Sequence, residues 1–255
     1  MVNYYFGVIM NRGLFKMKVV IAVIMLIVVA SAVAVTVYFN WLKPSGFKPQ
    51  GADGFVELPP PQTVGTMSVE EAIQRRRSIR SYTSDPLSLQ DVSQLLWAAQ
   101  GITDPARNLR AAPSAGATYP LEVYIVVGNN SVTGLADGVY RYDPYRHRLE
   151  HVLKGDLRLS LAEAALGQTW IREAPINIVI AAVYERTTGR YGERGIRYVH
   201  MEAGHAAQNL YLQATARGLG MVVVGAFHDD QIQELLQLPT DQKPLYIIPV
   251  GHPRS

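Results

Sequence analysis

Residues 195 to 217 read GIRYVHMEAGHAAQNLYLQATAR, and this stretch decides the fold that the sequence predicts. It is the longest helical segment of the main domain, and Gly218 ends it. Its small residues are Ala203, Gly204, Ala206, Ala207 and Ala214. Small side chains let another backbone come close, so we expect this helix to be buried in a core or in a subunit contact.

Strand-like segments lie on both sides of the long helix. LEVYIVV (121–127) and INIVIAAVY (176–184) are β-branched runs typical of buried strands. MVVVGAF (221–227) and LYIIPVGHP (245–253) follow the helix and are predicted as two further strands. The chain therefore returns to a sheet on each side of its longest helix.

Shorter elements complete the domain. Ser68 with Glu71, and Ser88 with Asp91, have the spacing of capping boxes, so a helix is predicted to begin after each serine. The second of these helices ends near Gly101. The remaining predicted elements are a hairpin over 138–152 and helices over 156–166 and 230–237. Helices and strands that are mixed in this way predict an α+β domain.

Composition excludes several classes of site. The chain has 255 residues, 48% of them hydrophobic, and contains no cysteine, so disulfides, thiolate metal sites and cysteine nucleophiles are excluded. The net charge of +3 comes without lysine-rich runs, so no nucleic-acid partner is expected. His200 and His205 are five residues apart and do not share a helix face, so we expect no metal site there.

The front of the chain differs from the domain. Residues 19–39 form an uncharged apolar run of membrane-spanning length, so a transmembrane helix is expected after a short basic N-terminus (1–18). A cleaved signal peptide is the alternative, because residues 30–32 are small. A Pro/Gly-rich linker (40–66) then leads to the domain (67–255). The basic residues favour a single-pass membrane protein with its N-terminus inside and its domain outside.

The stretch RRRSIRSY (75–82) has three arginines directly before Ser78 and a fourth two residues after it. Side chains alternate along an extended segment, so Arg76, Ser78 and Arg80 would share one face. Two guanidinium groups flanking a hydroxyl could bind an anion. A solvated basic patch is the other interpretation of such a charge run.

Several segments together resemble one known family. They are RRRSIR (75–80), PSAGATYP (113–120), EAGHAAQNLYLQATARGLG (202–220), MVVVGAF (221–227) and IIPVGHP (247–253). In this order they resemble the FMN-dependent nitroreductases over roughly residues 67 to 254. RYGERGIRYVHMEAGH (190–205) is most similar to the SagB/ThcOx-type azoline dehydrogenase branch. The resemblance implies a central, mostly antiparallel sheet flanked by helices, with the long helix buried at its centre.

The resemblance also implies an FMN site. Arg76, Ser78 and Arg80 match positions that hold the FMN phosphate and ribityl chain. Val224 and Gly225 match a strand exit whose backbone N–H groups face flavin N5, Gln168 matches a contact to the pyrimidine edge, and Arg254 is the late arginine available to the phosphate. The loop that meets the flavin from the partner subunit of a homodimer corresponds to Pro113, Ser114, Ala115 and Gly116.

The family implies transfer of a hydride from a reduced donor such as NAD(P)H, through flavin N5, to an electron-poor organic acceptor. In the azoline branch a Lys-Tyr pair assists proton removal, and Arg190 and Tyr191 stand at the matching positions. Arginine stays protonated and is a poor base, which disfavours thiazoline oxidation. The sequence thus predicts an FMN-dependent oxidoreductase. Its alternatives are an azoline-type dehydrogenase on a modified peptide and a non-catalytic, membrane-anchored flavin electron-relay module.

Overall fold

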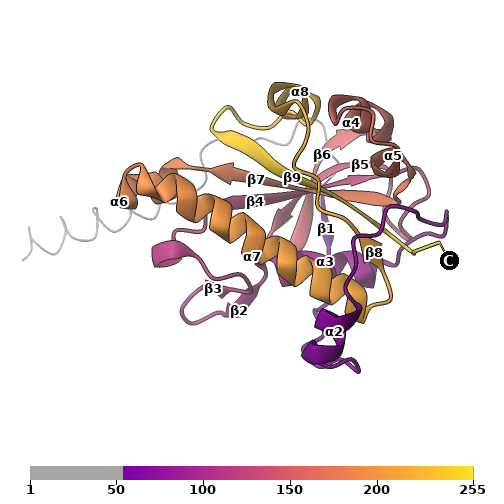
Figure 1. Cartoon of the computed structure of the whole chain (residues 1–255), viewed down its shortest axis with the longest axis horizontal. Coiled ribbons are helices and arrows are strands. Elements are labelled where there is room, and N and C mark those ends of the chain that lie inside the picture. Colours follow the sequence, from indigo (N-terminus) through magenta and orange to yellow (C-terminus); the bar gives the residue numbers. More distant parts are fainter. Residues whose placement is uncertain (1–53, 255) are drawn as a thin grey trace, which may run out of the picture. The chain divides into compact units, whose positions relative to one another are not determined.

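The predicted long helix is α7, Arg194–Ala216, in the computed structural model, which describes residues 54 to 254. Its buried apolar positions are Val199, Ala203, Ala206, Ala207, Leu210 and Ala214. They recur every three or four residues and form one face of the helix. Because most of them are small, α7 packs against α3, Leu89–Gln100, and against the central sheet (Figure 1). The predicted burial of this helix is confirmed.

A seven-stranded sheet forms the centre of the fold, and its neighbouring strands are antiparallel. In sheet order the strands are β1 (Phe55–Glu57), β6 (Arg148–Lys154), β5 (Gly138–Asp143), β4 (Leu121–Val127), β7 (Ile176–Val183), β9 (Gln242–Gly251) and β8 (Gly220–Met221). Every residue of β4 and β7 is buried, as their β-branched sequences predict. These two strands pair with Tyr124 opposite Val179.

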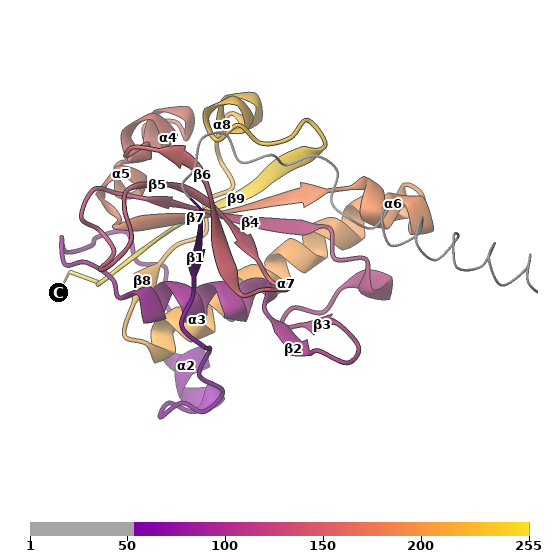
Figure 2. The ribbon, with the colours of Figure 1, turned by 180° about the vertical axis from the view of Figure 1, so that it is seen from behind.

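Helices cover both faces of the sheet (Figures 1 and 2). One face carries α3 and α7 with α2, Val69–Arg75, beside them. The other carries α4 (Arg158–Ala164), α5 (Thr169–Glu173) and α8 (Asp229–Leu235). The short connecting elements are β2 (Ile102–Asp104), β3 (Leu109–Arg110), the 3-10 turn η1 (Ala115–Ala117) and α6 (Glu185–Tyr191). The predicted α+β class with a helix-flanked antiparallel sheet is confirmed.

The two predicted helix starts differ in detail. Ser88 accepts a hydrogen bond from the Asp91 N–H, and the Asp91 carboxylate accepts one from the Ser88 N–H, which completes a capping box. Ser68 also accepts from the N–H of Glu71, at 3.1 Å. The Glu71 carboxylate instead pairs with Arg75 at 2.7 Å. The helix therefore begins where predicted, with an intrahelical ion pair on its exposed face.

The predicted strand over 221–227 is largely wrong. Its first residue, Met221, belongs to the two-residue strand β8, and Val224 makes one isolated bridge to Ile247. The N–H of Val223, which lies between them, donates to the hydroxyl of Tyr211 at 3.1 Å. A hydrogen bond to a helix side chain cannot be repeated along a strand, so the ladder is interrupted at this point.

Part of the predicted linker (40–66) pairs with the sheet. Within it, β1 lies beside β6, and Leu58 is buried. The Ser93 hydroxyl donates to the carbonyl of Pro59, at 2.5 Å. This stretch therefore packs on the domain that was predicted to begin at residue 67.

The predicted localisation, a single-pass membrane protein with an outside domain, is corrected here. Between residues 54 and 254 no helix is long and apolar enough to cross a bilayer. The longest helix within these residues, α7, mixes charged and polar residues with its apolar ones, unlike a membrane span. The segment 19–39, on which the localisation rested, lies outside the described residues, as does the basic N-terminus (1–18).

Candidate functional site

The arginine segment leaves α2 in an extended conformation, as the alternation argument requires. Arg76 is the C-cap of α2, with φ −51° and ψ 126°. Ser78 forms a parallel bridge with Met221 of β8, and the N–H of Ile79 donates to the Met221 carbonyl at 2.9 Å. Tyr82 is buried and its hydroxyl donates to the Ile79 carbonyl at 2.6 Å. The backbone of the segment is thereby fixed against the sheet.

Tyr211 of α7 contacts both Arg76 and Ser78. Its hydroxyl lies 3.0 Å from the Ser78 hydroxyl and accepts the hydrogen bond from Val223 N–H. The guanidinium carbon of Arg76 stands 4.9 Å from the centre of its ring. Arg76 and Ser78 therefore share one support, although the sequence analysis did not single out Tyr211. A tyrosine among the small residues of the long helix was the available signal.

Arg80 rests on a second aromatic ring. Its guanidinium carbon lies 5.6 Å from the ring centre of Trp170 in α5. The indole Nε1 of Trp170 is buried and has no hydrogen-bond partner among the described residues. Trp170 was also missed by the sequence analysis, although it follows Gln168 by two residues. We call Arg76, Ser78 and Arg80, with their supports Tyr211 and Trp170, the basic group.

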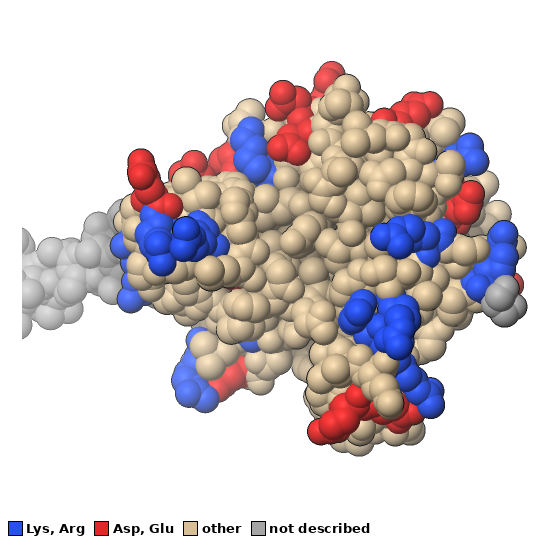
Figure 3. Space-filling model, in the orientation of Figure 1, with Lys and Arg blue, Asp and Glu red and all other residues tan. Residues whose placement is uncertain are grey.

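The cations of the basic group lack acidic partners. No carboxylate within the described part of the chain forms an ion pair with Arg76 or Arg80. Figure 3 shows Lys and Arg side chains gathered over α2 and toward the C-terminus, and a second set at the α6 end. Guanidinium groups supported by aromatic rings and free of carboxylates are suited to bind a phosphate.

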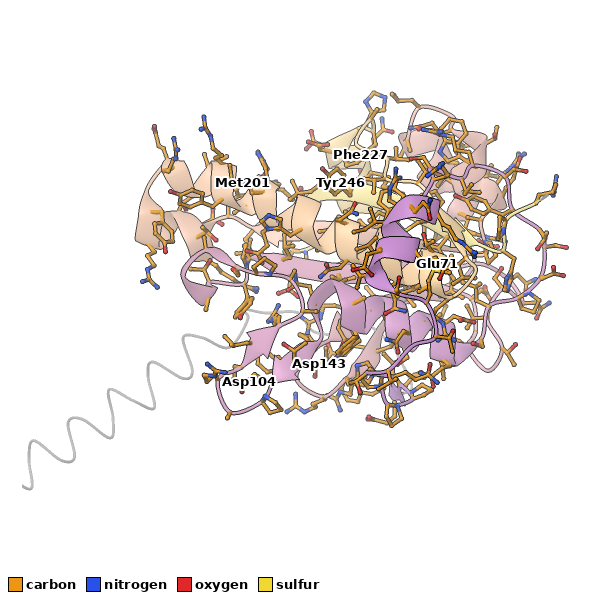
Figure 4. All side chains as sticks on the ribbon, turned by 60° about the horizontal axis from the view of Figure 1, so that its bottom comes forward. Glu71, Asp104, Asp143, Met201, Phe227 and Tyr246 are labelled. Atoms are coloured by element: carbon orange, nitrogen blue, oxygen red, sulfur yellow. The ribbon has the colours of Figure 1, made fainter. Side chains whose placement is uncertain are left out.

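The chain segment after β8 borders the basic group. The Val224 N–H donates to the Ile247 carbonyl at 2.9 Å, so of the predicted pair only Gly225 keeps an N–H without a partner in the described chain. Gly225 is exposed, and a Cβ placed on it would meet only the Tyr246 ring, at 3.8 Å. Figure 4 labels Tyr246 of β9 and Phe227, which lies two residues after Gly225. The expectation that both N–H groups are available is thus wrong for Val224.

Gln168 and Arg254 lie at the edges of the same region. The Gln168 amide donates to the carbonyl of Ala226, one residue beyond Gly225, at 2.8 Å. The N–H of Arg254 donates to the Ser81 carbonyl at 3.0 Å, which puts it beside the residue that follows Arg80. The structure thus brings both residues to the neighbourhood of the basic group.

Arg190, Tyr191 and the loop Pro113–Gly116 form a separate set, which we call the loop group. Gly116 has φ +60°, and its carbonyl accepts a hydrogen bond from Arg190 Nη1 at 3.0 Å. A Cβ on Gly116 would stand 2.5 Å from the Tyr191 hydroxyl, so the glycine lets this tyrosine approach the backbone. Ser114 Oγ accepts from the Tyr119 N–H at 2.9 Å. It lies near the buried carboxyl of Glu202 in α7, and burial raises the pKa of that carboxyl to about 7.

The two groups contact different halves of α7. The loop group meets the helix at Glu202 and the basic group at Tyr211, a separation of about 13 Å along a helix that rises 1.5 Å per residue. In Figure 4, Met201 marks the first half of α7 and Glu71 marks α2. Within one chain the predicted site residues therefore form two groups along α7.

The residues present fit an FMN. Arg76 and Arg80 form no ion pair within residues 54–254 and suit a phosphate. Gly225 is exposed and has no side chain, and the buried indole N–H of Trp170 has no acceptor among the described residues. Gln168 and the Gly225 N–H add polar contacts of the kind that orient a ligand.

Comparison with known proteins gives the same assignment. The profile of the nitroreductase family matches residues 73–252. The nitroreductase-type protein MJ1384 of Methanocaldococcus jannaschii is 49% identical over 196 residues, which cover 77% of this chain and 95% of that protein. A nitroreductase-type crystal structure from Ralstonia eutropha superposes with a TM-score of 0.68 at 30% identity, covering 83% of this chain and 97% of that one.

Two more distant relatives have assigned activities. The microcin B17-processing protein McbC of Escherichia coli is 28% identical over 60% of this chain and 57% of its own length. An FMN reductase of Bacillus subtilis is 25% identical over 72% of this chain and 66% of its own length. The chain belongs to the nitroreductase family, near its azoline-processing branch, and is an FMN-dependent oxidoreductase.

Proposed function

We propose that this oxidoreductase moves a hydride from a reduced nicotinamide donor, NAD(P)H, to a small electron-poor organic acceptor such as a quinone or a nitroaromatic. The FMN supplies the two-electron chemistry when it is bound. The observation that carries the proposal is that Arg76 and Arg80 lie over the rings of Tyr211 and Trp170 and form no ion pair with a carboxylate in the part of the chain that the structure describes. The protein side chains hold the cofactor and orient the substrate, and none of them needs to act as a nucleophile.

The basic group would hold the phosphate end of FMN. Arg76 and Arg80 supply charge-assisted hydrogen bonds, and Ser78 supplies a hydroxyl that is already oriented by Tyr211. The exposed N–H of Gly225 and the amide of Gln168 would contact the ring system, with Arg254 as a further cation near the phosphate. These assignments are supported by the positions of Gly225, Gln168 and Arg254 near the basic group.

The separation of the two groups along α7 supports a homodimer. Within one chain the two groups meet α7 about 13 Å apart along the helix. A second copy that packs on α7 could bring its Pro113–Gly116 loop to a ligand held by the basic group. We therefore propose a homodimer in which each cofactor is bordered by residues of both copies.

Substitution of single arginines tests the cofactor site. Arg76→Ala or Arg80→Ala in the full chain should weaken FMN binding roughly 10- to 100-fold, because each removes a charge-assisted contact. The control is Arg75→Ala, since Arg75 pairs with Glu71 on the outside of the same helix. FMN fluorescence quenching would measure the affinities. Equal affinities for the Arg76→Ala, Arg80→Ala and Arg75→Ala variants would refute the assignment.

Spectroscopy tests the reaction. Under anaerobic conditions the yellow protein should bleach with NAD(P)H and recover its colour with a quinone or a nitroaromatic. A yellow protein that no soluble donor reduces would instead indicate an electron-relay module. A colourless protein after addition of FMN would overturn the cofactor assignment.

One observation favours a second candidate, an azoline-type dehydrogenase. Tyr191 and Arg190 lie together against Gly116, so a tyrosine stands at the loop that would face the substrate. Tyr191 could donate or accept a proton, whereas Arg190 remains protonated. Oxidation of a thiazoline-containing peptide by the wild-type protein, abolished in Tyr191→Phe, would favour this candidate. Turnover of nitroaromatics alone would exclude it.

A further inference from the structure

Two arginines and two tyrosines form a row of contacts where α6 meets α7. The guanidinium carbon of Arg190 lies 5.5 Å from the ring centre of Tyr191, and that of Arg194 lies 5.9 Å from the ring centre of Tyr198. The two tyrosine rings meet edge to face, with their centres 5.2 Å apart. The row therefore has a cation at each end of an aromatic pair. We call these four residues the α6–α7 cluster.

The cations of the α6–α7 cluster are exposed and have no acidic partner. Neither Arg190 nor Arg194 forms an ion pair with a carboxylate within residues 54–254. The carboxylates on the same helices are Glu185, in the first turn of α6, and Glu193, the N-cap of α7, and both are exposed. Arg197, three residues beyond Arg194, is exposed as well. Figure 3 shows the positive side chains gathered at this end of the molecule.

Helix α6 holds the cluster beside the loop of the loop group. Arg186 Nη1 donates to the Tyr119 carbonyl at 3.1 Å, and Arg190 Nη1 donates to the Gly116 carbonyl at 3.0 Å. The Tyr191 hydroxyl would stand 2.5 Å from a Cβ on Gly116. The cluster is therefore attached to the loop that, in the proposed homodimer, borders the cofactor held by the other copy.

The chemistry of the cluster suits a purine that carries a phosphate monoester. Guanidinium planes and tyrosine rings are surfaces on which a purine base stacks. A guanidinium group also binds a phosphate through two parallel hydrogen bonds. Of the two nicotinamide dinucleotides, only NADPH has a phosphate monoester, on the 2′-oxygen of its adenosine, and an arginine is a recurrent partner of that group. An acidic peptide would use the cations and leave the rings without a role.

We propose that the α6–α7 cluster binds the adenosine 2′-phosphate end of the electron donor, so that the protein prefers NADPH to NADH. Arg194 binds the phosphate, and Tyr198 supports the purine. Arg190 and Tyr191 join this subsite to the loop at Gly116. The inference rests on the proposed function, because that function brings the nicotinamide end of the donor to the cofactor beside the loop.

Calorimetric titration of the FMN-loaded full chain with 2′-AMP and with adenosine tests the subsite without turnover. The wild type should bind 2′-AMP roughly tenfold more tightly than adenosine, because only 2′-AMP offers a phosphate to Arg194. Arg194→Gln should remove this difference, whereas Tyr198→Leu should weaken both ligands by about tenfold, because the stacking surface is lost. The control Arg107→Gln removes an exposed arginine between β2 and β3 and should bind both ligands like the wild type.

Two results of this titration would overturn the proposal. One is an equal affinity of the wild type and Arg194→Gln for 2′-AMP. The other is binding of polyglutamate by a wild type that does not distinguish 2′-AMP from adenosine, which would assign the cluster to an acidic peptide.

Steady-state kinetics with both donors test the preference. The ratio of kcat/KM for NADPH to kcat/KM for NADH should fall roughly tenfold in Arg194→Gln, because the lost contact is one that only NADPH makes. The ratio should be unchanged in Arg107→Gln. An equal loss for both donors in Arg194→Gln would refute the assignment to the 2′-phosphate. If neither donor reduced the wild-type protein, the proposed function would fail, while the 2′-AMP titration would still decide whether the subsite exists.

Discussion

The basic group and the loop group contact the same helix nine residues apart, yet they are built on different principles. Arg76 and Arg80 are charged side chains that lie over the rings of Tyr211 and Trp170 and have no acidic partner among residues 54–254. At Gly116 a side chain would not fit, because Arg190 and Tyr191 occupy the space where a Cβ would stand. The first region is specified by charge and the second by shape.

This difference predicts how each region tolerates change. In the basic group, removal of a supporting aromatic ring should weaken FMN binding and have little effect on folding. In the loop group, a side chain added at a glycine with positive φ should lower the free energy of unfolding and shift the neighbouring side chains. Variants in the two regions can therefore test whether FMN affinity depends on the basic group while stability and local geometry depend on the loop group.

The largest expected effect concerns the carboxyl beneath the loop group. Because burial raises the pKa of Glu202 from 4.5 to about 7, the folded state binds this proton more tightly than the unfolded state. This difference adds on the order of 3 kcal/mol to the free energy of unfolding. The contribution is fully present below pH 4.5 and is lost as the pH rises through about 7. Urea unfolding at pH 5 and pH 8 should show this loss in wild-type protein and not in Glu202→Gln. Parallel pH profiles would contradict the burial of an ionisable carboxyl.

Removal of the Tyr211 side chain should have the next largest effect, in the basic group. Tyr211→Ala deletes both the ring under Arg76 and the hydroxyl that bonds Ser78 and Val223. We expect FMN affinity to fall roughly 30- to 100-fold, because a cation–π contact and a hydrogen bond are lost together. Tyr211→Phe keeps the ring and should lose about tenfold. If both variants bound FMN equally well, Tyr211 would not be a support of the site.

A pair of glycine substitutions separates strain from contact in the loop group. Gly116→Ala and Gly134→Ala both place a side chain at positive φ, but only the first meets other atoms. Those atoms are the ends of the flexible Arg190 and Tyr191 side chains, so both variants should lose about 1 kcal/mol of unfolding free energy. Gly116→Ala should also displace Tyr191, which its fluorescence or a crystal structure would show. A much larger stability loss in Gly116→Ala would mean that the two side chains cannot move.

The smallest expected effect is at the edge of the basic group. Gln168→Ala removes amide hydrogen bonds to the Ala165 and Ala226 carbonyls and should weaken FMN binding by about threefold. Thr169→Ala, at the next and exposed position, should leave the affinity unchanged. A loss greater than for Tyr211→Phe would make Gln168 a principal contact and reverse the order proposed here.

The sequence predicted those helices and strands that are indicated by residues close together in the chain. The small residues of α7, the Ser88–Asp91 capping box and the β-branched runs of β4 and β7 each indicate a structure within a few neighbouring positions. The extended Arg76–Arg80 segment was predicted for the same reason, since alternation is a property of the backbone. The strand predicted over 221–227 was largely wrong because Tyr211 takes the Val223 N–H, and no local pattern reports that contact.

The sequence by itself determined the fold class, the long buried helix and the chemistry of the arginine-serine face, because periodicity, capping and charge act over short distances along the chain. Tertiary structure alone decided that Tyr211 supports Ser78 across 133 residues, that Trp170 supports Arg80, and that the Val224 N–H is already occupied. It also divided the predicted site residues between two halves of one helix. Such contacts join residues whose spacing in sequence carries no information about their distance in space.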